Sequence, residues 1–109
     1  MADVLKVLRG NIADGTGVAI LDGSTSTTYT VLSVSLCNTS GNDRTFSMWH
    51  SDAASANAAK IYEDQSLPAK ATFIHNDKIV LEAEDELWVN ASASSSTINY
   101  VVSFLEQTA

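Results

Sequence analysis

The segment Tyr29–Cys37, with the sequence YTVLSVSLC, decides the fold class of this chain. Aliphatic residues alternate with serine along it, so that one face of the segment is apolar (Leu32, Val34 and Leu36) and the other is polar. An alternation with a period of two residues is typical of a half-buried β-strand and does not fit a helix. We therefore predict that the centre of the fold is a β-sheet.

The residues that follow complete a β-hairpin. Asn38–Asp43 is a run of turn-forming residues, and Arg44–His50 alternates again, with Phe46, Met48 and His50 on one side. Two alternating runs that flank a polar loop containing glycine indicate two antiparallel strands.

The same pattern recurs towards the C-terminus. The lone Pro68 marks a strand end, because proline cannot donate a backbone hydrogen bond to a sheet. The last strand has one apolar face that carries Ile98, Tyr100, Val102 and Phe104, whereas Val101 and Leu105 point the other way. Ser51–Ala59 and Ser94–Ser96 are predicted loops. The further predicted strands are Lys60–Leu67, Ala71–His75, Lys78–Leu81, Glu86–Ser92 and Thr97–Glu106.

The N-terminal part is less clearly patterned. Val4–Leu8 fits a strand or a helical turn, and Val18–Leu21 fits a strand between the turn-forming stretches Asp14–Gly17 and Asp22-Gly23. With 109 residues, the chain has the usual size of one domain. We predict one all-β domain over residues 1–109, with an N-terminal arm and the first strands in residues 1–27. About eight short strands then form an antiparallel β-sandwich, either jelly-roll or Ig-like.

Charge and composition narrow the classes of partner. Thirteen acidic residues against six basic ones give a net charge of −7, which disfavours binding to nucleic acid or to an anionic membrane. The N-terminus lacks a basic stretch followed by an apolar run, so we expect no signal peptide and synthesis in a cytoplasm.

Catalytic and metal-binding patterns are scarce in the sequence. The one cysteine, Cys37, excludes an intramolecular disulfide, and a nucleophilic pairing with His50 or His75 would depend on the hairpin register. No motif surrounds these residues, so we predict that Cys37 is structural and that the chain is not an enzyme. We expect no catalytic residue, no cofactor and no metal site.

The acidic stretch Glu82, Glu84, Asp85 and Glu86 leaves two interpretations open. Its carboxylates could offer oxygen ligands to a hard cation, although the spacing lacks the pattern of an EF-hand loop. The alternative is a solvated turn between two strands, where the charges keep the surface soluble.

Two tryptophans are the candidate interface residues. The alternation places Trp49 opposite Phe46 and Met48, and it places Trp88 opposite Leu87 and Val89. Tryptophan is enriched in the cores of protein interfaces. The alternative is that both side chains lie in a second layer of the sandwich or under a loop.

From Thr30 to Glu106 the strands and turns follow in the order VSLCNTSG (Val34–Gly41), FSMW (Phe46–Trp49), LPA (Leu67–Ala69), VLEAED (Val80–Asp85), LWVNAS (Leu87–Ser92) and VVSFLE (Val101–Glu106). This order resembles that of small β-sandwich virion proteins of tailed bacteriophages. This resemblance implies a virion component, with a capsid decoration (cement) protein as the first expectation. Such a protein would bind the major capsid protein on the outer shell and associate with itself, as a homotrimer. The alternative is a tail, neck or fibre component that recognises a host glycan, with Trp88, Asn90 and Glu86 as the nearest residues.

Overall fold

A computed structural model describes residues 2–12, 17–52, 58–91 and 97–108 of the chain. These residues contain strands and turns, and none of them lies in a helix. The strands are β1 (Ala2–Ile12), β2 (Val18–Asp22), β3 (Thr27–Asn38), β4 (Arg44–Ser51), β5 (Ala59–Leu67), β6 (Thr72–His75), β7 (Ile79–Leu81), β8 (Glu86–Ala91) and β9 (Ile98–Thr108). The predicted all-β fold is confirmed, with nine strands in the described residues where about eight were expected.

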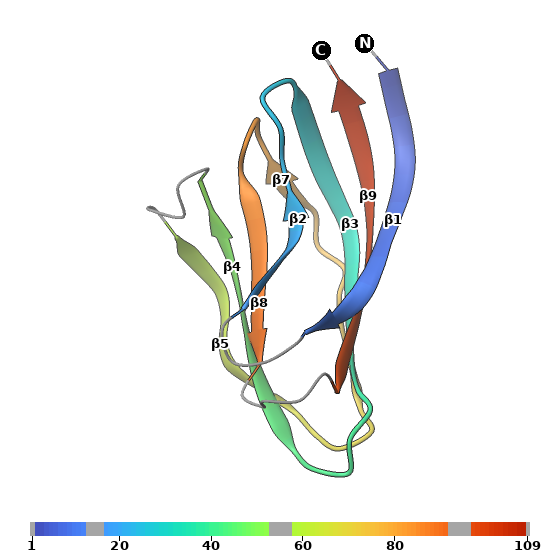
Figure 1. Ribbon diagram of the computed structural model, residues 1–109, viewed down its shortest axis with the longest axis vertical. Coiled ribbons are helices and arrows are strands. Elements are labelled where there is room, and N and C mark those ends of the chain that lie inside the picture. Colours follow the sequence, from blue (N-terminus) through green and yellow to red (C-terminus); the bar gives the residue numbers. More distant parts are fainter. Residues whose placement is uncertain (1, 13–16, 53–57, 92–96, 109) are drawn as a thin grey trace.

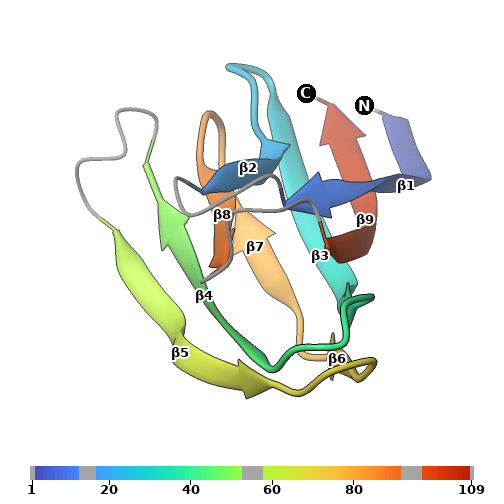
Figure 2. The ribbon, with the colours of Figure 1, turned by 60° about the horizontal axis from the view of Figure 1, so that its bottom comes forward.

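The strands form two antiparallel sheets that face each other. The first, called the β1 sheet, has the order β1-β9-β3-β6, and β7 also pairs with β3; the second, called the β2 sheet, has the order β2-β8-β4-β5. Figure 2 shows β4 and β5 along one side and β1, β9 and β3 along the other. The strand pairs are nested along the sequence: β1 pairs with β9 at the two ends, β2 pairs with β8 inside them, and β4 pairs with β5 in the middle. This nesting is the jelly-roll form of the predicted sandwich.

The core lies between the two sheets and comes from the inward face of each strand. Its centre contains all but one of the predicted apolar residues of the hairpin, and Phe46 and Met48 are at most 1% exposed. The last strand contributes Ile98, Val102 and Phe104, as the alternation predicted, and Val101 points outwards. The core is completed by Ile12, Ile20, Leu21, Val31, Val34, Leu36, Leu67, Leu81, Leu87, Val89 and Ala91.

The sequence-based prediction placed one residue of Tyr29–Cys37, Leu32, on the wrong face of the strand. Val34 and Leu36 are fully buried as expected, but Leu32 is only half-buried, and Val31 takes its place in the core. The register of β3 against β9 shifts between Val31 and Ser33. A β-bulge of this kind inserts one residue and moves the side chains before it to the opposite face.

The N-terminal segment forms an extended strand. β1 runs over Ala2–Ile12, which resolves the choice between strand and helical turn for Val4–Leu8, and β2 matches the predicted strand at Val18–Leu21. In Figure 1, β1 lies beside β9 at the outer edge of its sheet. Most of the predicted turn at Asp14–Gly17, the centre of the predicted loop over Ser51–Ala59 and the whole of Ser94–Ser96 lie outside the described residues.

Asn38 ties the end of β3 to two neighbouring loops. Its side-chain nitrogen donates to the carbonyl oxygens of Asn42 (2.8 Å), Leu67 (3.0 Å) and Pro68 (3.3 Å). Its side-chain oxygen accepts from the backbone N–H (3.0 Å) and the hydroxyl (2.7 Å) of Ser40. The residue is 0% exposed, so these bonds satisfy an amide that burial would otherwise penalise.

Candidate interaction surfaces

Trp49 and Trp88 lie next to each other on the outer face of the β2 sheet. They occupy directly opposed positions of β4 and β8, and their rings stack with centroids 6.0 Å apart and planes 8° apart. Ala19 of β2 is opposite Trp88, and Lys60 of β5 is opposite Trp49 with its ammonium 5.0 Å from the ring centroid. We call these four residues the tryptophan row, which crosses all four strands of the sheet.

Three residues of the tryptophan row, Ala19, Trp49 and Trp88, are half-buried, whereas Lys60 is exposed. A backbone segment packs against the two rings. An added Cβ at Gly17 would lie 3.4 Å from Trp49 and 3.5 Å from Trp88, and the φ of this glycine is +89°. A side chain at this position would be strained by the backbone conformation. The sequence correctly placed both tryptophans opposite the core, and their role as an interface stays a prediction.

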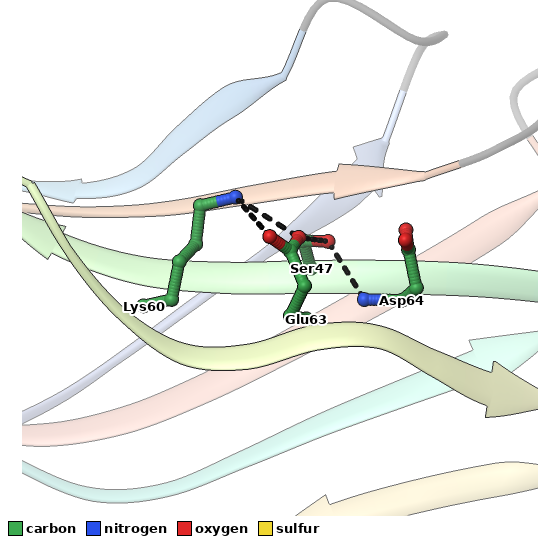
Figure 3. Close-up of polar contacts among 4 residues, drawn as sticks. All are labelled: Ser47, Lys60, Glu63 and Asp64. Carbon is green, nitrogen blue, oxygen red and sulfur yellow. Dashed lines mark hydrogen bonds and ion pairs between the residues drawn. The ribbon is translucent and has the colours of Figure 1, made fainter.

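Lys60 is held in place by a hydrogen-bonded group on β4 and β5 (Figure 3). Its ammonium donates to the two carboxylate oxygens of Glu63 at 3.1 and 3.4 Å, and the Ser47 hydroxyl donates to Glu63 at 3.0 Å. These hydrogen bonds, from Lys60 first and then from Ser47, lower the pKa of Glu63. The Asp64 N–H donates to Ser47 Oγ at 3.0 Å, and Asp64 has a φ of 48°. The group therefore fixes β5 where its register against β4 is irregular.

Two acidic residues stand side by side at the other end of this face. Asp22 of β2 is directly opposite Glu86 of β8, and the Trp88 indole N–H donates to Glu86 Oε1 at 2.9 Å. Burial raises the pKa of Asp22, and the neighbouring charge of Glu86 raises it further.

The remaining acidic residues build the turn between β7 and β8. The Asp85 N–H donates to the Glu82 carbonyl at 2.9 Å, and the Asp85 carboxylate accepts from the Glu82 N–H at 2.9 Å and lies 3.6 Å from His50 Nε2. Glu84 has a φ of 68° within the turn. Among the described residues, no three or more His, Cys, Asp and Glu side chains form a group suited to a metal ion.

The structure does not bring Cys37 and the histidines into one site. Cys37 is half-buried on the outer face of β3, between the fully buried Leu36 and Asn38. His75 lies on the inner face of the same sheet, where its Nδ1 is 2.7 Å from the Tyr62 hydroxyl. His50 Nε2 is 3.0 Å from the carbonyl oxygen of Val80.

A second surface, which the sequence reasoning missed, is the outer face of the β1 sheet. Five aliphatic side chains on it are 40 to 73% exposed: Leu5, Val7, Ile74, Val80 and Val101. We call this surface the apolar face. The pairing register places these residues in cross-strand rows, with Leu5 in line with Leu105, Thr30 and Val80, and with Val101 in line with Ser35 and Ile74.

The sequence did contain a signal for the apolar face. Val101 and Leu105 point away from the core side of their strand, and the stretch Val4–Leu8 carries apolar residues at both alternating positions. Single exposed aliphatic residues are ordinary, whereas several on one sheet face are typical of a protein contact surface. A hollow on this face is lined by Leu5, Val7, Leu32 and Ser103, among others.

Comparisons with known proteins define the class of fold. No protein family model and no curated protein matches the sequence. Among solved structures, a chain of the T13 particle of infectious bursal disease virus is similar at a TM-score of 0.57 and 6% identity. The match covers 95% of this chain and 30% of the viral one. A chain of the Gx strain of the same virus matches at a TM-score of 0.53 and 10% identity, over 97% of this chain and 33% of its own length.

These similarities show a shared β-sandwich fold. The present chain spans about a third of the length of the viral chains that it matches. The described residues contain no helix with the length and apolar character needed to cross a membrane.

Proposed function

We propose that this chain is a non-enzymatic virion structural protein of a tailed bacteriophage that decorates the capsid shell. The observation that carries the proposal is the apolar face, where Leu5, Ile74 and Val80 are 73, 57 and 53% exposed on a chain with a net charge of −7. Exposed aliphatic side chains gain free energy when a protein partner covers them. The fold that the chain shares with part of the viral particle chains supports the same class of role.

The apolar face would bind the major capsid protein, and the acidic remainder of the surface would face outwards. A decoration protein stabilises a shell by bridging neighbouring subunits, so each copy needs contacts to more than one partner. Several weak contacts held together bind more firmly than each alone, and self-association would supply them. The phage resemblance implies three copies in the assembly, whereas the edge strand β1 favours two, and the mass of the oligomer in solution distinguishes these possibilities.

The experiment is co-sedimentation of the purified chain with empty, expanded shells of the major capsid protein encoded in the same genome. Wild type should pellet with the shells in a saturable ratio, whereas Ile74→Lys and Val80→Lys should weaken binding at least about tenfold. Ser66→Lys is the matched control, because Ser66 is also an exposed strand residue but lies on the other sheet. Shells that stay undecorated by folded wild-type protein would refute the proposal.

The alternative, a glycan-binding tail or fibre component, would use Trp88, Asn90 and Glu86 on the outer face of β8. A sugar ring stacks on an open aromatic face, but the Trp88 ring stacks on Trp49 and packs near Gly17, where an added Cβ would lie 3.5 Å from it. We therefore place this function second. A copy number in purified virions that matches the shell lattice supports decoration, and only a few copies per particle would favour the tail or fibre.

A further inference from the structure

We propose that β1 is a pairing edge at which two copies of this chain join their β1 sheets. The two β1 strands would run antiparallel about a two-fold axis, with Asp3 of each copy opposite Arg9 of the other. This inference goes beyond the proposed function and does not depend on it, since it concerns only the contact of the chain with itself.

The first argument is that β1 differs from the other strands at the sheet edges. An unpaired edge offers free N–H and C=O groups to another strand, and proteins usually protect such edges with short strands, bulges or charges. β6 and β7 have 4 and 3 residues, and β2 has 5 residues and a register shift. β5 has two register shifts and carries Lys60, Glu63 and Asp64.

β1 lacks two of these protections, because it is long and has no bulge, although it does carry the charged residues Asp3, Lys6 and Arg9. Its 11 residues pair with β9 in an uninterrupted register from Ala2 to Ile12, and β9 is its one strand partner in the described residues. Leu5 and Val7 are 73 and 52% exposed on the outer face, and on the inner face Val4 and Leu8 are 42 and 45% exposed. A long, regular edge with exposed aliphatic side chains on both faces favours the addition of a strand.

The charges of β1 select one register. A two-fold axis perpendicular to the joined sheet keeps the outer faces of both copies on one side, so directly opposed residues must share a face. Asp3, opposite Gln107, lies on the outer face with Leu5, Val7 and Arg9. Lys6 lies on the inner face, opposite the buried Phe104, and therefore cannot oppose Asp3. Arg9 is the one basic residue of β1 that can.

Pairing Asp3 with Arg9 also brings the aliphatic residues together. It sets Leu5 of each copy opposite Val7 of the other, so that two aliphatic pairs lie between two ion pairs on the outer face. On the inner face, Val4 of each copy meets Leu8 of the other. Opposite charges and aliphatic residues in directly opposed positions both stabilise antiparallel strands.

The centre of this register brings together Lys6 from both copies, which is its one unfavourable contact. Each ammonium already lies 3.1 Å from Glu106 Oε1 of its own chain, so both charges are neutralised before the copies meet. The two outer faces become one surface, and the apolar face doubles in area. A dimer of this kind offers two equivalent binding surfaces to a partner.

The test is sedimentation equilibrium of the full chain over a concentration series that reaches about 0.1 mM. Wild type should approach twice the chain mass of 11.6 kDa. Asp3→Arg and Arg9→Asp should each raise the dissociation constant at least about tenfold, since symmetry makes each substitution act twice. The double variant Asp3→Arg/Arg9→Asp restores opposite charges and should return the dissociation constant to within about threefold of wild type.

Two further variants keep the test independent of folding effects. Leu5→Lys adds a charge to an exposed position of β1 and should abolish the dimer, whereas Ile74→Lys adds the same charge on β6 and should leave it intact. Circular dichroism confirms that each variant is folded. A monomeric wild type, a trimer, a dimer that tolerates both single charge reversals, or a double variant that fails to recover would each overturn the proposal.

Discussion

The substitution Trp88→Ala tests whether the tryptophan row stabilises the folded chain. It removes a ring stacked on Trp49 at 6.0 Å and the indole donor of the 2.9 Å hydrogen bond to Glu86. The stack contributes about 1 kcal/mol, the hydrogen bond about 1 kcal/mol and the half-buried apolar surface about 1 kcal/mol more. We expect a loss of about 3 kcal/mol in the free energy of unfolding, measured by urea titration followed by circular dichroism.

Two companion variants separate these contributions. Trp88→Phe keeps a ring for stacking and loses the N–H donor, so it should cost about 1 to 2 kcal/mol. A double-mutant cycle with Trp49→Ala should give a coupling energy of about 0.5 to 1.5 kcal/mol. A Trp88→Ala protein with unchanged stability and no coupling to Trp49 would refute the reasoning. If that protein also associated about 2 kcal/mol more weakly, the tryptophans would instead be an interface.

Three further substitutions test other parts of the structure. Asn38→Asp replaces the donor to three carbonyl groups with a buried carboxylate and should cost about 3 to 5 kcal/mol at pH 7. The cost should shrink at pH 4, where the new carboxyl takes up a proton, and a loss under about 1 kcal/mol in urea unfolding at pH 7 would contradict the hydrogen-bond assignment. Tyr62→Phe removes the 2.7 Å hydrogen bond to His75 and should lower the unfolding free energy by about 1 to 2 kcal/mol in the same assay. The raised pKa of Asp22 means that folding favours its protonated form, so its favourable contribution is full below the pKa of the unfolded chain and is lost as the pH rises through the higher pKa of the folded state. Asp22→Asn should therefore raise the melting temperature more at pH 7 than at about pH 3.5, and the opposite order would contradict this sign.

Local alternation predicted most of the strands, because it reports directly which side chains face the core. The bulge at Leu32 was not predictable from the same signal, since one inserted residue reverses the faces without changing the composition. The choice between jelly-roll and Ig-like pairing was also beyond the local pattern. It depends on contacts between β1 and β9, which lie at opposite ends of the chain.

The two candidate surfaces differ in how well the sequence revealed them. Trp49 and Trp88 stand out by residue type, and their alternation with Phe46 or Leu87 placed them correctly on the outer face. Their stacking could not be foreseen, because it depends on the register that sets them directly opposite each other. The apolar face was missed because its members come from several strands, each contributing one or two residues.

The inner face of β1 carries aliphatic side chains that the fold leaves exposed. Val4 and Leu8 point to the same side as the core, yet they remain 42 and 45% exposed. β2, the edge strand of the other sheet, has only 5 residues, whereas β1 has 11. The β2 sheet therefore cannot cover β1 along its whole length. Aliphatic side chains that folding leaves uncovered add little to the stability of the monomer and make association with a neighbour favourable. Their presence on both faces of the least protected edge is therefore better explained by a contact outside the chain than by the fold, and the charge reversals at Asp3 and Arg9 test whether that contact is a second copy.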